Sequence, residues 1–383
     1  MSRPIRVLEV IGGANRGGAE TWLLEALRNL DRERLDVHLL VHYAAPGAYD
    51  AEIRAMGFPI HKCVGHRRPW HYIRGLRRLL DGSGPFDVVH SHVNLFSGLV
   101  MRVAQRAGVP VRVAHGHTAK PPPADMPAGR ALYEGTMRRW VQRHATLGFG
   151  VSEGAAETLF GRAWQCDRRW EVLHCGIPLD GFRASVDRST VRAELGLSPT
   201  DLVIGHIGRF VAAKNHAFLL QTIAELAGLE PSTRLVLVGD GPLRPHIEDL
   251  SERLGLGNRV VFLGAREDIP RLLMGAVDVF LFPSLYEGLP LACLEAQAAG
   301  VPVVMSDTIT REVEVVKELV TRMPLTCPPV AWAEVCLAAG RLRRAGSPGC
   351  WLARLEGGTH DVRVSARTLE RKLLAACEAS RPA

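Results

Sequence analysis

Lysine is scarce in this chain of 383 residues, and several common sequence signals are absent. Among 47 basic residues only five are lysine: Lys62, Lys120, Lys214, Lys317 and Lys372. The eight cysteines include no C-x-x-C pair, which argues against a zinc site or a redox pair and favours buried thiols in a reducing compartment. No apolar run reaches the roughly 18 residues of a spanning helix, and the N-terminus lacks a signal-peptide pattern. We therefore expect a cytoplasmic protein.

The overall composition is that of a globular protein, with 47% hydrophobic and 23% charged residues. The length is sufficient for two domains that each bury a full core. A net charge of +7 permits anionic partners such as nucleotides, phosphates or anionic lipid. The arginine-rich composition is an equally good explanation of this charge, so charge alone selects no partner.

Short apolar runs alternate with segments of helical spacing along nearly the whole chain. The runs predict strands at 5–11, 36–42, 87–92, 109–115 and 146–151, and again at 202–208, 233–241, 259–264, 277–283 and 301–307. Helical spacing appears at 19–30, 69–80, 95–107, 128–143, 215–228, 242–254 and 289–299. Such alternation predicts parallel sheets covered by helices on both faces.

The Gly- and Pro-rich stretch CGIPLDGF (175–182) separates two such series. We therefore predict an α/β protein with two doubly wound, Rossmann-like domains at 1–180 and 181–361, facing each other across a cleft. A last segment, 362–383, is expected to form a helix that returns to the first domain. Ligands of such domains bind at the carboxyl ends of the strands.

The stretch GGANRGGAE (12–20) follows the first predicted strand and opens a helix. Gly17 and Gly18 would let backbone N–H groups approach a phosphate at the helix N-terminus. The pattern is not the G-x-G-x-x-G of dinucleotide-binding proteins. Glycine-rich turns of this kind also occur for steric reasons alone, so both interpretations stay open.

A second loop, in GHIGRFVAAKNH (205–216), places Arg209 and Lys214 five positions apart between a strand and a helix. Two cations at this spacing suit one diphosphate. The alternative is an ordinary basic loop.

Two glutamates, Glu287 and Glu295, lie in FLFPSLYEGLPLACLEAQAAGVPVV (280–304). Pro290 favours a helix start between them, and two helical turns would turn both carboxylates toward one side. Carboxylates accept hydrogen bonds from paired sugar hydroxyls, and the N–H groups near Gly288 and Leu289 can meet phosphate oxygens. The alternative is that Glu287 only caps the helix and that Glu295 is only a solvated side chain.

These motifs together resemble a known family. The stretches GRFVAAKN, VGDGPLR, FLGAREDIP and PSLYEGLPLACLEAQAAGVPVV resemble the donor half of the GT-B glycosyltransferases of family 4. At the N-terminus, RVLEVIGGANRGGAE, DVVHSH and VRVAHGH are similar to bacterial exopolysaccharide or capsule hexosyltransferases. The resemblance covers nearly the whole chain and implies the GT-B fold. One departure is Cys175-Gly176-Ile177-Pro178 at the domain junction, where members often read N-G-I/V-D.

The resemblance also implies roles for individual residues. Arg209 and Lys214 would bind the donor diphosphate, Glu295 the nucleotide ribose, and Glu287 the hydroxyls of the donor sugar. The same resemblance assigns the base contact to the backbone after Gly264, around Ala265 and Arg266, and it places Gly17 and Gly18 in the glycine loop that faces the donor phosphates. Either His115 or His117 corresponds to the active-site histidine near the transferred sugar.

The expected activity is transfer of a hexose or N-acetylhexosamine from a nucleotide sugar, first of all a UDP-sugar, with retention of anomeric configuration. No D-x-D triplet is present, so we expect neither a metal nor a resident cofactor, with Arg209 and Lys214 neutralising the diphosphate instead. The expected acceptor is a lipid-linked saccharide in exopolysaccharide or capsule synthesis. The basic segments 66–80 and 130–144 could contact an anionic membrane, or form solvated helix faces.

Three alternatives remain at this stage. One is transfer to a small natural-product acceptor, and another is a UDP-sugar epimerase of the same architecture. The third is a basic module that binds membrane or nucleic acid; the transferase interpretation expects no nucleic acid.

Overall fold

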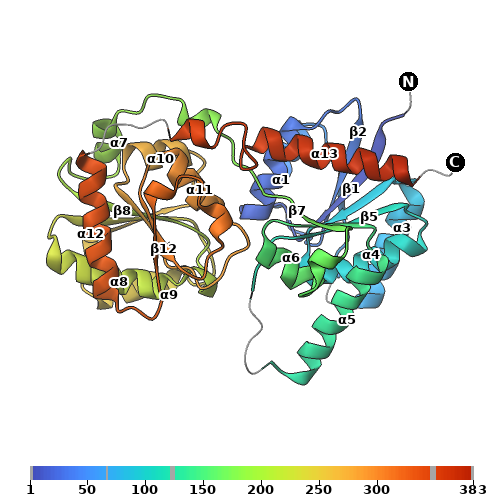
Figure 1. Cartoon of the computed structure of the whole chain (residues 1–383), viewed down its shortest axis with the longest axis horizontal. Coiled ribbons are helices and arrows are strands. Elements are labelled where there is room, and N and C mark those ends of the chain that lie inside the picture. Colours follow the sequence, from blue (N-terminus) through green and yellow to red (C-terminus); the bar gives the residue numbers. More distant parts are fainter. Residues whose placement is uncertain (1–2, 66–67, 121–125, 346–350, 381–383) are drawn as a thin grey trace. The chain divides into compact units, whose positions relative to one another are not determined.

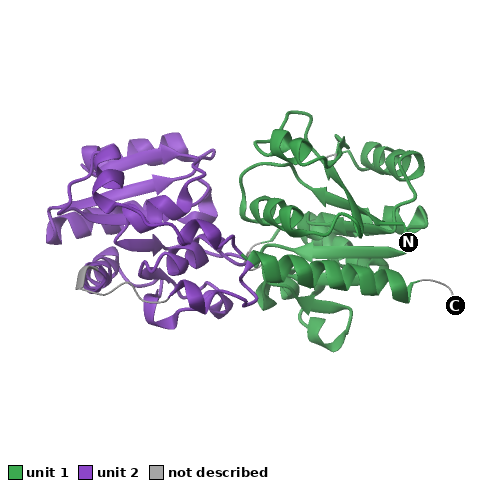
Figure 2. Ribbon diagram, turned by 90° about the horizontal axis from the view of Figure 1, so that it is seen from above, with its two compact units in different colours: residues 1–176, 362–383 green, residues 177–361 purple. Residues whose placement is uncertain are grey.

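The computed structural model describes residues 3–65, 68–120, 126–345 and 351–380, which form two compact units (Figure 1, Figure 2). Unit 1 comprises Met1–Gly176 and Val362–Ala383, and unit 2 comprises Ile177–Asp361. The expected boundary at residue 180 falls inside unit 2. Each unit is a parallel sheet with flanking helices, which confirms the predicted fold class of two Rossmann-like domains.

Unit 1 is built on a seven-stranded parallel sheet. Its strands, in spatial order, are β3 (Ile60–Lys62), β2 (Leu35–Val41), β1 (Ile5–Ile11), β4 (Val88–Ser91), β5 (Val111–Gly116), β6 (Leu147–Gly150) and β7 (Trp170–Val172). The central strands carry aliphatic side chains on both faces because helices cover both faces of a parallel sheet. β1 is buried along nearly all of its length.

The helices of unit 1 come from both ends of the chain. They are α1 (Gly18–Asn29), α2 (Asp50–Ala55), α3 (Pro69–Gly82), α4 (Ser97–Arg106), α5 (Ala128–His144), α6 (Glu153–Phe160) and α13 (Val362–Ala379). α13 packs beside α1 (Figure 1). Trp22 Nε1 donates to Ser365 Oγ at 3.2 Å, and Arg34 Nη1 lies 3.0 Å from Glu370 Oε1. The last helix therefore returns to the first domain, as predicted.

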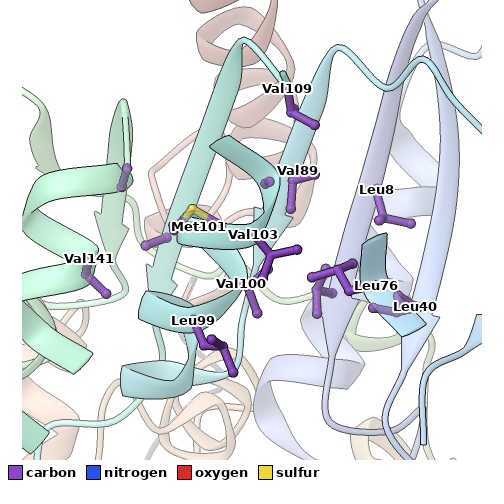
Figure 3. Close-up of a cluster of buried hydrophobic side chains, with 14 of the residues drawn as sticks. Leu8, Leu40, Leu76, Val89, Leu99, Val100, Met101, Val103, Val109 and Val141 are labelled. Atoms are coloured by element: carbon purple, nitrogen blue, oxygen red, sulfur yellow. The ribbon is translucent and has the colours of Figure 1, made fainter. Parts of the chain in front are cut away.

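A continuous apolar core fills the space between the unit 1 sheet and its helices. Figure 3 shows part of this cluster, with side chains from the sheet and from α3, α4 and α5 in contact. Its labelled members are Leu8, Leu40, Leu76, Val89, Leu99, Val100, Met101, Val103, Val109 and Val141. Burial of each such side chain stabilises the unit by about 1.5–3 kcal/mol relative to exposure.

Unit 2 repeats the plan with six parallel strands. They run, in spatial order, as β10 (Val260–Gly264), β9 (Thr233–Val238), β8 (Leu202–Ile207), β11 (Val279–Phe282), β12 (Val303–Ser306) and β13 (Val320–Met323). Its helices are α7 (Arg188–Glu194), α8 (His216–Leu229), α9 (Arg244–Arg253), α10 (Ile269–Gly275), α11 (Leu291–Ala298) and α12 (Pro329–Ala345).

One buried carboxylate ties helix α7 to the unit 2 sheet. Asp278 accepts hydrogen bonds from Arg188 and Arg192, each at 2.7 Å, and from the Val203 backbone at 2.9 Å. A buried charge is tolerated when it is paired and fully hydrogen-bonded. The Asp278 cluster therefore fixes α7 against the start of β8 and leaves the opposite, carboxyl end of the sheet to the functional loops.

Among the residues that the structure describes, no helix has the length and hydropathy needed to cross a bilayer. The described cysteines are all free thiols, and most of them are buried. Of the basic segment 66–80, positions 66 and 67 lie outside the described residues.

Candidate functional site

The predicted residues of unit 2 gather on loops at the carboxyl ends of β8, β10 and β11. Lys214 ends a short 3-10 turn before α8, and Glu287 lies between β11 and α11. Their side chains meet, with Lys214 Nζ 2.7 Å from Glu287 Oε1. The two loops are also joined through their backbones, since Leu285 N donates to Ala213 O at 2.8 Å. Two residues 73 positions apart therefore form one ion pair.

Arg209 follows β8 on the same loop as Lys214, and its side chain is exposed. Among the described residues no carboxylate pairs with its guanidinium. The loop itself is held by its backbone, because Phe210 N donates to Asp240 O at 3.0 Å. Arg209 is thus an exposed cation on an ordered loop, five residues before Lys214, and no described carboxylate compensates its charge, which suits an anionic ligand.

Glu295 lies in the second turn of α11, half-buried among apolar residues. Burial raises the pKa of its carboxyl to about 8. Within the described part of the chain its side chain has no hydrogen-bond or ion-pair partner. An unpartnered carboxylate in such surroundings costs folding free energy, and perturbed acids of this kind concentrate at functional sites.

Helix α11 begins immediately after the Glu287 loop, with Pro290 as its extended N-cap. Gly288 and Leu289 precede it and are buried. The free N–H groups and the dipole of a helix N-terminus favour an anion. The backbone at Gly288 and Leu289 therefore stays a predicted contact for phosphate oxygens.

The segment expected to contact the base follows β10. Gly264 has φ +66, a left-handed conformation that favours glycine, and it turns the chain so that Ala265 and Arg266 are exposed. The Arg266 guanidinium is held by Asp268 through two hydrogen bonds of 2.8 Å. Its side chain is therefore occupied, which leaves the backbone of this turn as the group available to a ligand.

In unit 1, Gly17 and Gly18 lie where β1 passes into α1. Gly17 is the extended N-cap of the helix, and a Cβ there would lie 2.6 Å from a carboxylate oxygen of Glu20. At Gly18 a Cβ would meet no heavy atom within 4 Å. The packing of unit 1 therefore does not require glycine at position 18, and close approach by a ligand remains a reason for it.

The histidines of unit 1 form a buried hydrogen-bonded network around Glu9. Glu9 Oε1 lies 3.2 Å from His90 Nδ1, and Glu9 Oε2 lies 2.8 Å from His92 Nε2. The chain continues in two branches: His90 Nε2 lies 3.2 Å from His115 Nδ1, and His92 Nδ1 lies 2.8 Å from His117 Nε2. Because side chains two apart on a strand share a face, the HSH and HGH motifs on β4 and β5 bring all four rings together.

The charged group of this network is the Glu9 carboxylate. Burial acts to raise the pKa of Glu9, but His90 and His92 outweigh it and lower this pKa to about 2. Burial, followed by the charge of neighbouring histidines, lowers the pKa of His115 and of His117 well below the ordinary value. The pKa of His92 falls to about 4 for the same first reason. At neutral pH these three histidines are therefore neutral and Glu9 is ionised.

The two candidate histidines differ in access. His115 is fully buried, and its Nε2 has no partner. His117 lies just past the end of β5 and is only partly buried. Of the two, His117 is the one that a ligand can reach. Glu9 was not predicted from the sequence, although a lone acid within the apolar run IRVLEVI was the available signal.

A pocket of about 1080 Å³ opens in unit 1 between α3, α4 and α5, and sequence patterns did not predict it. His92 lies at its lining, together with the aromatic residues Trp70, Phe96, Tyr133 and Trp140. Its basic residues are Arg77, Arg102 and Arg106. Arg102 stacks on Trp140, with its guanidinium carbon 4.2 Å from the ring centroid, while the Trp70 side chain is 77% exposed. The pocket is thus apolar in its walls and cationic at several points.

Comparison with known proteins assigns the two units separately. Residues 187–334 match the family described as "Glycosyl transferases group 1", and residues 17–176 match the "Glycosyl transferase 4-like domain". The putative glycosyltransferase EpsF of Bacillus subtilis is 38% identical over 345 residues, which cover 88% of this chain and 89% of that protein.

A second relative is the UDP-Gal:alpha-D-GlcNAc-diphosphoundecaprenol alpha-1,3-galactosyltransferase of Escherichia coli. It is 27% identical over 311 residues, which cover 76% of this chain and 76% of that protein. Among solved structures, Anabaena Alr3699/HepE in complex with UDP and glucose superposes with a TM-score of 0.72 at 20% identity and covers 98% of both chains. That structural likeness shows the fold. With the two domain matches and the relative at 38% identity, the chain belongs to the family 4 glycosyltransferases of the GT-B fold.

Proposed function

We propose that this glycosyltransferase moves a hexose or N-acetylhexosamine from a UDP-sugar to a lipid-linked saccharide in exopolysaccharide or capsule synthesis. The observation that carries the donor half of the proposal is the set of groups on the unit 2 loops. Lys214 and Glu287 form a pair, and among the residues that the structure describes neither the Arg209 cation nor the Glu295 carboxyl has an ion-pair partner. Together they offer positive charge for a diphosphate and acceptors for hydroxyls.

In the proposed mechanism, Arg209 and Lys214 stabilise the negative charge that develops on the UDP leaving group. Glu295 accepts hydrogen bonds from the ribose hydroxyls, and Glu287 accepts them from the donor sugar while it orients Lys214. His117 contacts the transferred sugar from unit 1. The acceptor hydroxyl attacks from the face that the diphosphate leaves, a phosphate oxygen takes its proton, and the anomeric configuration is retained.

The donor assignment is tested by hydrolysis of UDP-, GDP- and ADP-sugars without acceptor. We expect turnover of a UDP-sugar, at a rate that a chelator such as EDTA does not change, because fixed cations occupy the role of a metal. Loss of activity in EDTA and recovery with magnesium or manganese would contradict metal independence. NMR of the transfer product should show the same anomeric configuration as the donor, and an inverted product would contradict retention.

The pocket of unit 1 supports a lipid-linked acceptor. Aromatic walls suit an isoprenoid chain or a stacked sugar ring, and its arginines suit a diphosphate. The E. coli relative is described by its name as acting on a diphosphoundecaprenol-linked sugar. Such a substrate would bring the enzyme to the surface of an anionic membrane, where exposed Trp70 and Leu132 could insert. We therefore propose this pocket as the acceptor site.

Replacing Arg102 by glutamine should raise the KM for a polyprenyl-diphosphate-linked sugar by about tenfold, because a charge-assisted contact is lost. The KM for the UDP-sugar should change much less. Arg139→Gln is the matched control, since Arg139 is exposed on α5 and does not line the pocket. Steady-state kinetics with both substrates measures the difference. Equal effects of the two substitutions on the KM for the acceptor would refute the acceptor site.

A further inference from the structure

We propose that Glu9 is a positioning residue that fixes the proton on His117 through His92. The inference rests on the proposed function, in which His117 contacts the transferred sugar. Glu9 lies on β1, fully buried at 1% exposure, and within the described part of the chain the side chains that its carboxylate hydrogen-bonds are His90 and His92. Its effect on the reaction would therefore pass through ring nitrogens rather than through contact with substrate.

The direction of each hydrogen bond follows from counting protons. An ionised carboxylate only accepts, so His90 Nδ1 and His92 Nε2 must both carry the proton. A neutral imidazole has one N–H, which leaves His92 Nδ1 bare. His117 Nε2, at 2.8 Å from that bare nitrogen, must then be the donor. His117 is left with a bare Nδ1, which is a hydrogen-bond acceptor.

The second branch gives an internal check. The same arrangement, with the neutral His115 donating its Nδ1–H to His90 Nε2 at 3.2 Å, leaves a bare ring nitrogen at His115 Nε2. This is the nitrogen that is buried without a partner. A bare ring nitrogen there leaves no N–H group unsatisfied, whereas the opposite tautomer would bury one. Both branches therefore agree on the same proton arrangement.

This proton arrangement determines which kind of hydrogen bond His117 can make with a ligand. With Nδ1 bare, the ring accepts a hydrogen bond from a sugar hydroxyl and cannot donate one from that nitrogen. If the network lost its carboxylate, both tautomers of His92 would be populated. Because His117 hydrogen-bonds to His92, both tautomers of His117 would then be populated as well. In a fraction of the enzyme His117 Nδ1 would then carry a proton, and it could no longer accept the hydrogen bond from the sugar hydroxyl.

The first test reads the protons directly in the full-length wild-type protein labelled with ¹⁵N-histidine. Long-range ¹H–¹⁵N spectra at neutral pH should show the Nε2–H tautomer for His92 and His117, and the Nδ1–H tautomer for His90 and His115. An Nδ1–H tautomer at His117 would overturn the proposal. So would one equivalent of a tightly bound transition metal in the purified protein, because nitrogens of His90, His92 and His115 lie within 4.8 Å of one another.

The second test uses Glu9→Met, which removes both acceptors at nearly constant volume, and Glu9→Asp, which keeps them. We expect mixed tautomers at His117 in Glu9→Met and a kcat about tenfold lower, with the KM for the UDP-sugar little changed. Glu9→Asp should recover part of both. Tyr72→Phe is the control for destabilisation, because it removes another buried hydrogen bond of unit 1 outside the network, the one that joins Tyr72 Oη and His42 Nε2 at 3.0 Å.

Two results separate this inference from the proposed function. If the wild-type protein turns over no UDP-sugar, the proposed function fails, while the spectra still decide the proton arrangement. If UDP-sugar turnover is present and Glu9→Met keeps the wild-type kcat, or Tyr72→Phe lowers kcat equally, the positioning role of Glu9 is overturned.

Discussion

Replacing Lys214 by methionine should lower kcat by about 10²–10³-fold, the usual cost of removing one preorganised group that stabilises transition-state charge. The Lys214 ammonium nitrogen lies 4.7 Å from the Phe282 ring centroid, and methionine keeps most of the apolar stem, so the substitution removes mainly the charge and its contact with the ring. It also leaves Glu287 without its partner, which should weaken the order of the loop before α11. Single-turnover kinetics with a UDP-sugar measures the chemical step separately from binding.

Lys317→Met is the matched control for Lys214. Lys317 is an exposed lysine of unit 2, on a different loop, and its replacement should leave kcat within about twofold because isolated surface charges contribute little. The same charge is removed from the same unit, so a general effect of net charge would appear in both variants. A Lys214→Met enzyme that also keeps kcat within about twofold would eliminate Lys214 as the residue that stabilises the leaving group.

Replacing Glu295 by glutamine should have opposite effects on binding and on stability. The Kd for UDP should rise by about 10–100-fold, because hydrogen bonds from the ribose hydroxyls to a charged acceptor are lost. Without ligand, the variant should be more stable than wild type at pH 8, by more than about 1 kcal/mol, which corresponds to a rise in Tm of about 2–4 °C. Calorimetric titration with UDP and thermal unfolding measure the two effects.

The pH dependence of this stability difference has a definite sign. The pKa of Glu295 is raised from 4.5 to about 8 on folding, so between these values the folded state holds a proton that the unfolded state has lost. Wild-type stability therefore falls as pH rises through this window. Glutamine does not titrate, so the advantage of Glu295→Gln should be absent near pH 4.5 and complete above pH 8. UDP binding, which needs the ionised carboxylate, should strengthen over the same window in wild type alone.

Glu225→Gln serves as the control, since Glu225 is exposed on α8 of the same unit. It should change neither the Kd for UDP nor the unfolding temperature. If Glu295→Gln binds UDP as tightly as wild type, the ribose assignment is wrong. If it is no more stable than wild type at pH 8, the Glu295 carboxylate does not destabilise the folded state as proposed.

The repeating strand and helix pattern was predictable because parallel strands buried on both faces read as uninterrupted apolar runs. The run at 5–11 coincides with β1. Strand ends were less accurate, since an apolar run does not show where the ladder stops. The run at 233–241, for example, yields a strand only to Val238, because Gly239 adopts φ +138 and turns the chain.

Three of the four edge strands, β3, β7 and β13, and several helices were not predicted, whereas the edge strand β10 coincides with the predicted run at 259–264. β3 and β7 have three residues each, and β13 has four, too short to show a period. Helix α12 was missed despite its 17 residues, because Pro328 and Pro329 and the following arginines hid its apolar face.

The proximity of the candidate residues could be inferred from the sequence for unit 2 and much less so for unit 1. The Lys214 and Glu287 loops could be expected to approach each other, because β8 and β11 are neighbours in the sheet and their loops leave the same edge. Which of the two histidines a ligand can reach depends on how deeply each side chain is buried, and a single sequence does not reveal burial. The role proposed for Glu9 depends on its carboxylate contacting His90 and His92 on the neighbouring strand segment, a pairing that becomes visible only in three dimensions.

Helix α13 imposes an order on folding during synthesis. It follows unit 2 in the chain, yet Ser365 and Glu370 bind partners in and just after α1, so unit 1 is complete only after unit 2 has left the ribosome. Unit 2 is continuous and can fold as soon as it emerges. Until α13 emerges, the surface of unit 1 that this helix covers, including Trp22, stays exposed in the nascent chain, and apolar surface exposed in this way is prone to aggregation.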